Sequence, residues 1–313
     1  MNMQFEKIAQ SIAADGIIAS SDILALRRTG WSDGEITPSQ AKAIFDLNDA
    51  LTERPEEWVD FFVEAIGDHV LNGIDPKGHV SEEQGYWLIS RLSDSGHLNS
   101  MAELHLLTRL VEQADSVPEN LRCFILEELE RAILTGTGPT RCGGELAANH
   151  VTSAECTILR RVIFAPASDR PAAVSKREAD LLFRIKQATR HAENAPEWEQ
   201  LFVQGVANYL RGFSPSNAQL SRKKAKALDK FMSDRNHHAG RFLGRMAQEA
   251  PNSMGVVFGR KRTDSTVSLD KQVARAAQIS TTEQKWLDDH LGPRGERDDY
   301  DCALLAFLSE ERG

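Results

Sequence analysis

The sequence contains few cysteines, and none of them has a spacing typical of metal binding or of a disulfide framework. The four cysteines are Cys123, Cys142, Cys156 and Cys302. This scatter disfavours a disulfide scaffold or a zinc knuckle, and a reducing, cytoplasmic location is expected. No apolar run reaches the length of about 18 residues that a membrane span needs. The first 20 residues also lack the continuous apolar stretch of a secretory signal.

Recognisable catalytic motifs are missing as well. The sequence has no phosphate-binding loop, no Gly-x-Ser-x-Gly and no His-Glu-x-x-His, and its nine histidines show no metal-ligand spacing. Cys142 lies in a glycine-containing turn and is a candidate reactive thiol, but no general base is placed beside it. We therefore predict a non-catalytic protein without a cofactor. An enzyme that uses Cys142 or a histidine is the alternative.

The alternation of polar and apolar residues that marks a half-buried strand is also lacking. Apolar side chains recur instead at helical spacing along the segment that begins at Trp58. Several predicted helices begin with a capping box, in which a Ser or Thr is followed three residues later by Glu or Gln. These boxes are Thr37–Gln40, Ser81–Gln84, Thr152–Glu155, Ser175–Glu178 and Ser280–Glu283. The predicted fold class is all-α.

An internal duplication accounts for most of the helical pattern. The apolar stripe that begins at Trp58 recurs from Trp198 at a constant offset of 140 residues, and the helix that follows Thr37 recurs after Ser175. The Trp87 helix has two candidate counterparts, one that starts near Leu220 and a weaker one that contains Trp286. We interpret residues 15–93 and 148–233 as two copies of one unit. The expected architecture is a tandem, repeat-like helical bundle.

The two halves of the chain differ in charge. Residues 1–134 carry 10 basic and 24 acidic residues, a net charge of −14, and the remainder carries +5, which together give the −9 of the whole chain. We predict an acidic helical domain over 1–134, a glycine-rich linker over 135–150 and a basic-leaning helical domain over 151–313. The asymmetry favours recognition of a protein partner through complementary charge.

The basic residues of the second half form the candidate partner-binding clusters. They are Arg222, Lys223, Lys224, Lys226 and Lys230, followed by Arg260, Lys261 and Arg262. Such clusters contact phosphates in nucleic-acid-binding proteins. The net negative charge and the lack of interleaved aromatic residues disfavour a nucleic acid here. An acidic protein surface, of the first half itself or of another protein, is the preferred partner, and a homo-oligomer is left open. Trp31, in a predicted loop, is the candidate surface anchor.

Acidic residues of the first half support an alternative function in divalent-metal binding. Asp33 and Glu35 lie in a glycine turn, whereas Asp60, Glu64 and Asp68 recur every fourth residue along the Trp58 helix. Hard cations prefer such carboxylate oxygens. The second copy carries amides at the three helix positions, so a site of this kind belongs to the first half alone. A solvated helix face explains the same spacing without a metal.

The repeated helix starts resemble those of a known family. The segments Asp33–Phe45, Gly78–Leu92 and Val174–Phe183 each place an aliphatic residue and a Ser or Thr cap before an amphipathic helix, and in the first two a glycine turn precedes them. These segments are similar to TerB-like domains, the all-helical domains associated with tellurite resistance in bacteria. The resemblance implies a helical bundle in which acidic residues bind metal, with Asp33 and Glu35 at matching positions.

Overall fold

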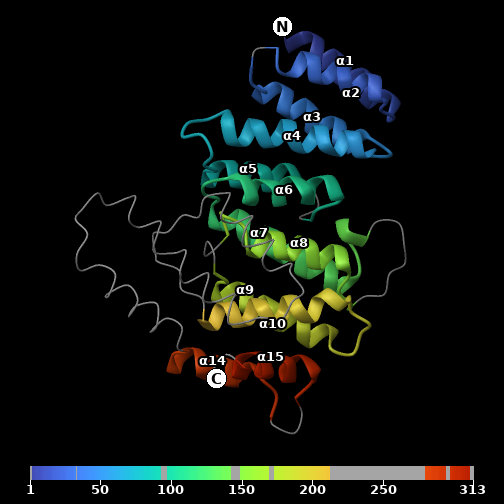
Figure 1. The fold of residues 1–313 in the computed structure, drawn as a ribbon. Coiled ribbons are helices and arrows are strands. Elements are labelled where there is room, and N and C mark those ends of the chain that lie inside the picture. The colour runs from blue at the N-terminus through green and yellow to red at the C-terminus, as the bar shows by residue number, and fades with distance from the viewer. Residues whose placement is uncertain are drawn as a thin grey trace, which may run out of the picture. The chain divides into compact units, whose positions relative to one another are not determined.

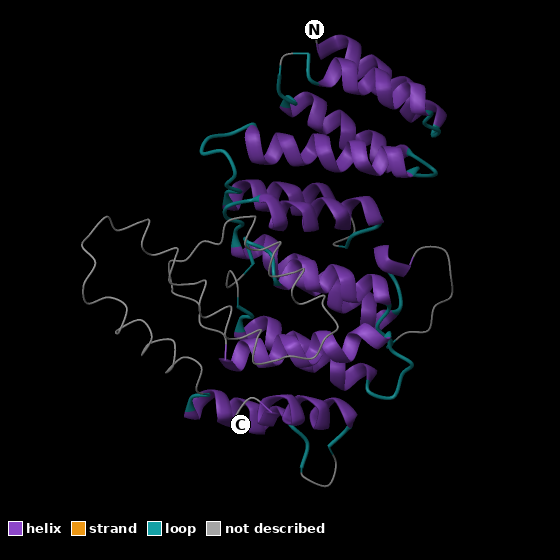
Figure 2. Ribbon diagram, viewed as in Figure 1, coloured by secondary structure: helices purple, strands orange, loops and turns teal. Residues whose placement is uncertain are grey.

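Helices make up nearly all of the described structure. The computed structural model describes residues 2–32, 34–92, 97–141, 149–168, 173–211, 279–293 and 297–310. Within these ranges no residue belongs to a strand, and the extended contacts are limited to an isolated bridge between His79 and Ser116 (Figure 2). The all-α prediction is confirmed.

The first of two compact units holds the N-terminal helices. Unit 1 comprises Met1–Glu128 and Gly138–Gly144. Its α-helices are labelled in Figure 1 and are α1 (Asn2–Asp15), α2 (Ser20–Gly30), α3 (Pro38–Ala50), α4 (Glu56–Asn72), α5 (Glu82–Leu92), α6 (Met101–Gln113) and the first part of α7 (Glu119–Thr135). The unit also holds the short 3-10 helix η1 (Pro139–Arg141). In this unit α4 packs against α2, α3 and α6, and α1 covers α2 and α3.

The second unit repeats the same set of helix contacts. Unit 2 comprises Leu129–Thr137 and Glu145–Gly313. Besides the end of α7, its described helices are α8 (Ser153–Ile163), α9 (Lys176–Thr189), α10 (Pro196–Arg211), α14 (Thr281–His290) and α15 (Asp299–Glu310). Here α10 packs against α8, α9 and α15, just as α4 packs against α2, α3 and α6. The tandem duplication is therefore present in the structure as well as in the sequence.

The two central helices, α4 and α10, bury equivalent apolar faces. Trp58 and Phe62 of α4 and Trp198 and Phe202 of α10 are each fully buried. Full burial of one such side chain is worth about 1.5–3 kcal/mol, so each face is a major source of stability for its unit. The predicted capping boxes fix where the surrounding helices begin, and each closes with both hydrogen bonds in place. They lie at Thr37, Ser81, Thr152, Ser175 and Ser280.

The structure decides which segment of unit 2 takes the place of α5. In unit 1, Trp87 of α5 meets the edge of Phe45 at 5.6 Å between ring centroids and an interplanar angle of 85°. In unit 2, Trp286 of α14 meets Phe183 in the same way, at 5.4 Å and 77°. The segment that contains Trp286 is thus the structural counterpart of α5. The alternative start near Leu220 lies outside the described residues.

A buried polar network in unit 1 joins α3, α4 and α6. Asn48 is fully buried, and its Oδ1 accepts a hydrogen bond from the Trp58 indole nitrogen at 3.2 Å. Its Nδ2 donates to Glu103, the capping residue of α6, at 3.4 Å. A side-chain amide suits this position because it donates and accepts at once.

The matching position of unit 2 holds a buried cation. Lys186 is 3% exposed and pairs with Asp301 at 2.8 Å and Asp298 at 2.6 Å, both at the start of α15. An ammonium group has no lone pair with which to accept a hydrogen bond. Accordingly, the indole nitrogen of Trp198 is buried without a hydrogen-bond partner among the described residues. At this matched position the helices are joined by neutral and charged hydrogen bonds of Asn48 in unit 1 and by ion pairs of Lys186 in unit 2.

Removal of the buried cation is predicted to destabilise unit 2. Lys186→Ala leaves Asp301, which is 2% exposed, without its countercharge, and breaking a buried pair in this way costs about 3–5 kcal/mol. Lys186→Asn introduces the residue of unit 1 and gives the Trp198 indole a hydrogen-bond acceptor. It is therefore expected to lose less stability than Lys186→Ala. Urea unfolding followed by circular dichroism measures both variants. Equal losses would contradict this account of the site.

The network in unit 1 predicts a pH effect on stability. Burial raises the pKa of Glu103, and hydrogen bonds from the Asn99 and Ser100 backbone oppose this only in part. A carboxyl group whose pKa is raised by folding stabilises the native state at low pH and loses that contribution as the pH rises. The free energy of unfolding of the wild type, relative to Glu103→Gln, is therefore expected to fall as the pH rises above 4.5. A difference between the two proteins that does not change from pH 4 to pH 7 would contradict this.

Candidate functional site

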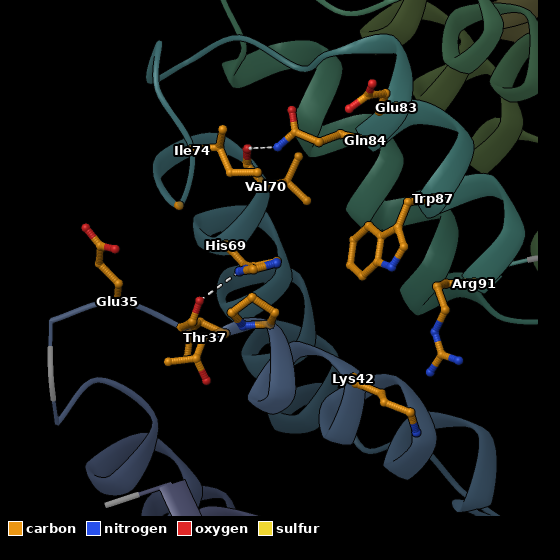
Figure 3. Close-up of a pocket in the computed structure, with 13 residues that line it drawn as sticks. Glu35, Thr37, Lys42, His69, Val70, Ile74, Glu83, Gln84, Trp87 and Arg91 are labelled. Carbon is orange, nitrogen blue, oxygen red and sulfur yellow. Dashed lines mark hydrogen bonds between the residues drawn. The ribbon is translucent and has the colours of Figure 1, made fainter.

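A groove lies within unit 1, among α3, α4 and α5. Its volume is about 700 Å³, which is within the usual range of ligand pockets. The floor combines the apolar side chains Ile36, Pro38, Val70 and Trp87 with polar groups (Figure 3). The polar and charged residues that line the groove are Glu35, Thr37, Lys42, His69, Glu83, Gln84 and Arg91.

Two hydrogen bonds hold the walls of the groove together. Nδ1 of His69 lies 2.7 Å from the backbone oxygen of Ile36, which ties the end of α4 to the start of α3. Because a carbonyl only accepts, this Nδ1 carries the proton. On the opposite wall, Gln84 donates to the backbone oxygen of Val70 at 3.0 Å and joins α5 to α4. The groove is therefore formed by three helices and the turns beside them, and these two hydrogen bonds fix its walls to one another.

One end of the groove is cationic. Lys42 and Arg91 both pair with Asp46, Arg91 at 2.6 Å. Burial alone would raise the pKa of Asp46, but the hydrogen bonds and charges of Lys42 and Arg91 outweigh it and lower the pKa. Two cations thus share one ionised carboxylate, and a net positive charge remains. The Arg91 guanidinium lies over the Phe45 ring at 5.5 Å, and its buried Nε makes no hydrogen bond within the described residues.

The opposite end is acidic and partly apolar. Glu35 approaches Lys77 at 3.9 Å, and both side chains are largely exposed. Glu83 is exposed on α5, and Ile74 is 56% exposed in the turn after α4. Figure 3 shows Glu35 and Ile74 on the side of the groove away from Lys42 and Arg91. The groove therefore has an apolar middle between ends of opposite charge.

Unit 2 covers the same tryptophan position with its own side chains. Trp286 is 7% exposed, and the Tyr209 ring packs against it at 4.7 Å. In unit 1 the matching residue is His69, whose smaller ring lies 5.9 Å from Trp87. Trp87 is only half-buried and faces the groove. Trp286 is therefore buried, whereas Trp87 is partly exposed where it lines the groove.

Most of the predicted acidic stripe has a structural role in unit 1. Glu64 pairs with Arg27, and Asp68 accepts a hydrogen bond from the indole nitrogen of Trp31 at 3.0 Å. Trp31 is half-buried and meets the edge of Phe61 at 6.1 Å. These contacts join α2 to α4. Asp60 is exposed on α4.

The remaining predicted metal and partner residues are only partly described. Glu35 lines the groove, whereas Asp33 lies outside the described residues. Within the described ranges, no group of three or more His, Cys, Asp and Glu side chains is arranged to hold a metal ion. The predicted cationic partner residues also lie outside the described residues; they are Arg222, Lys223, Lys224, Lys226, Lys230, Arg260, Lys261 and Arg262.

The enzyme alternative names Cys142 as its candidate thiol. Cys142 lies outside the described residues. Burial, reinforced by the nearby charge of Glu197, raises the pKa of the Cys156 thiol to about 12. A thiol in such a site stays protonated at neutral pH and is a poor nucleophile. An enzyme that uses Cys142 stays a prediction.

Sequence reasoning missed Lys42, His69, Trp87 and Arg91 as a group. They come from three helices, and nothing in their local spacing marks them as neighbours. A signal was nevertheless present in the aligned copies, because Lys42 corresponds to Asp180 and Asp46 to Arg184 in helices whose apolar positions match. A reversal of charge at a matched position is a useful pointer to divergent function.

No family model, no curated protein and no solved structure matches the chain. The resemblance to TerB-like domains stays a prediction. Separately, none of the described helices is long and apolar enough to cross a membrane.

The difference between the two tryptophans predicts different costs of truncation. Trp286→Ala is expected to destabilise unit 2 by about 3–5 kcal/mol, as is usual for buried aromatic residues. Trp87→Ala should cost about half as much, because the side chain already contacts solvent. Urea unfolding of the full chain compares the two. A Trp87→Ala loss as large as that of Trp286→Ala would contradict the open groove.

Proposed function

We propose that the chain is a non-catalytic protein-recognition module that binds a segment of a partner protein in the groove of unit 1. The observation that carries this proposal is the pair of equivalent tryptophans. Trp286 is covered by side chains of its own unit, whereas Trp87 faces an open groove. Partly exposed aromatic side chains in pockets are typical anchors of protein interfaces.

The character of the groove favours a peptide over other ligands. Its apolar middle can take an aliphatic or aromatic side chain of the partner, which would pack on Trp87 and the exposed Pro38. Its ends of opposite charge can then fix the direction and register of the bound segment. Exposed Ile74 adds apolar surface at the acidic end of the groove. The proposal retains charge-guided recognition and a cytoplasmic setting, and it locates the recognition site in the acidic half.

Filling the groove is expected to abolish binding. His69→Tyr introduces the residue that covers the tryptophan in unit 2, at the expected cost of about 0.5–1.5 kcal/mol for the lost hydrogen bond to Ile36. Peptides selected from a random display library against the full chain provide the probe, and fluorescence anisotropy measures their affinity. We expect at least a tenfold weaker binding to His69→Tyr than to the wild type.

The matched control is the reverse exchange in unit 2. Tyr209→His should leave the affinity of the selected peptides unchanged, because it alters the tryptophan site of the other copy. Circular dichroism and urea unfolding establish that both variants are folded. Selected peptides that bind His69→Tyr as tightly as the wild type would overturn the proposed site.

A further inference from the structure

We infer that the cationic end of the groove receives the side-chain carboxylate of an Asp or Glu in the bound peptide, which donors on Trp87, Lys42 and Arg91 would hold. The inference rests on the proposed function and names the chemistry of its ligand. Its basis is the comparison of two copies of the same site within one chain.

Unit 2 shows how this tryptophan position accommodates a carboxylate. The indole nitrogen of Trp286 donates to Asp180 at 2.7 Å. His290 lies on the same side, with its Nε2 at 3.4 Å from Asp180 and its ring 4.9 Å from that of Phe183. The tryptophan, the aromatic ring below it and a nitrogen-bearing side chain therefore surround a carboxylate that the chain itself supplies.

Unit 1 keeps the tryptophan, the aromatic ring and a nitrogen-bearing side chain, but it lacks the carboxylate, and Pro38 takes the place of Lys176, which pairs with Asp180 at 2.8 Å. Trp87 and Phe45 match Trp286 and Phe183, and Arg91 lies over Phe45 as His290 lies against Phe183. At the position of Asp180, however, unit 1 carries Lys42. The indole nitrogen of Trp87 makes no hydrogen bond within the described part of the chain. At this position a carboxylate that accepts a hydrogen bond is replaced by a cation that cannot accept one. The indole N–H of Trp87 can therefore donate to a ligand.

The charges and directions of these groups suit an incoming anion. Figure 3 shows the indole nitrogen of Trp87 on the side of its ring that faces Arg91, with Lys42 beyond it. Asp46 balances only one of the two cations. A carboxylate placed here would accept hydrogen bonds from an indole N–H and from charged donors, which are the stronger kind. At the acidic end, Glu35 and Glu83 favour a basic residue of the same peptide.

The indole proton of Trp87 gives a direct test in the full chain. It is assigned in ¹H–¹⁵N spectra by its loss in Trp87→Phe. Three pools of acetylated hexapeptides serve as probes: amidated peptides with a fixed Leu-Glu pair, amidated peptides with a fixed Leu-Gln pair, and Leu-Gln peptides with a free C-terminal carboxylate. We expect the Leu-Glu pool to move this proton downfield and to bind at least tenfold more tightly than either other pool.

Two variants with the same change of charge distinguish an effect at the Trp87 site from an effect of the net charge of the protein. Lys42→Asp places the unit 2 residue beside Trp87, so the indole is expected to bond within the protein and the preference for the Leu-Glu pool to disappear. Lys7→Asp makes the same charge change on an exposed position of α1 and should retain the preference. A Lys42→Asp protein that binds the Leu-Glu pool like the wild type would overturn the inference.

The remaining outcomes distinguish this inference from the proposed function. Equal shifts of Trp87 with the Leu-Glu and Leu-Gln pools would overturn carboxylate recognition and leave the peptide groove standing. A shift only with the free C-terminal pool would overturn the side chain as the source of the carboxylate. If no pool moves the Trp87 proton, the inference fails, and the peptides obtained by display decide separately whether the groove binds a partner.

Discussion

Burial of one tryptophan-led helix face in each unit is the constraint on which the rest of the structure depends. Trp58 of α4 and Trp198 of α10 are inaccessible to solvent, and each central helix packs against three equivalent neighbours. Because protein interiors are close-packed, these faces leave little room for change. The surrounding helices are therefore held in the same arrangement in both units. Side chains at their edges can change while their positions stay defined, which lets one scaffold carry two different sites.

Two differences between the copies lie where polar groups meet this core. Asn48 and Lys186 join corresponding helices through a neutral network in one unit and an ion cluster in the other. The tryptophans of α14 and α5 differ in a similar way. The indole nitrogen of Trp286 donates a hydrogen bond to Asp180 in unit 2, whereas Trp87 has Lys42 in place of that carboxylate in unit 1. Each exchange is a single residue with consequences for hydrogen bonding and charge. The exchange of Asn48 for Lys186 follows the charge difference between the halves, whereas that of Lys42 for Asp180 runs against it.

Local physical chemistry made the helices predictable and left the site hidden. The stripe from Trp58 and the capping box at Thr37 depend on residues close in sequence, and both were found from the sequence. The function of Asp68 was missed because its partner, Trp31, comes from another helix. A carboxylate row gives the same sequence pattern whether it binds metal, faces water or joins two helices. The groove was missed for the same reason, since Lys42, His69 and Trp87 meet only after three helices have packed.

The central claim is that equivalent tryptophans are closed in unit 2 and open in unit 1, and hydrogen exchange of their indole protons tests it most directly. In the wild-type chain, with each resonance assigned by a Trp→Phe variant, the account predicts slow exchange for Trp286, which is buried and bonded to Asp180. It predicts exchange faster by at least tenfold for Trp87, which is half-buried. Equal protection of the two indoles, or slower exchange at Trp87, would contradict the account.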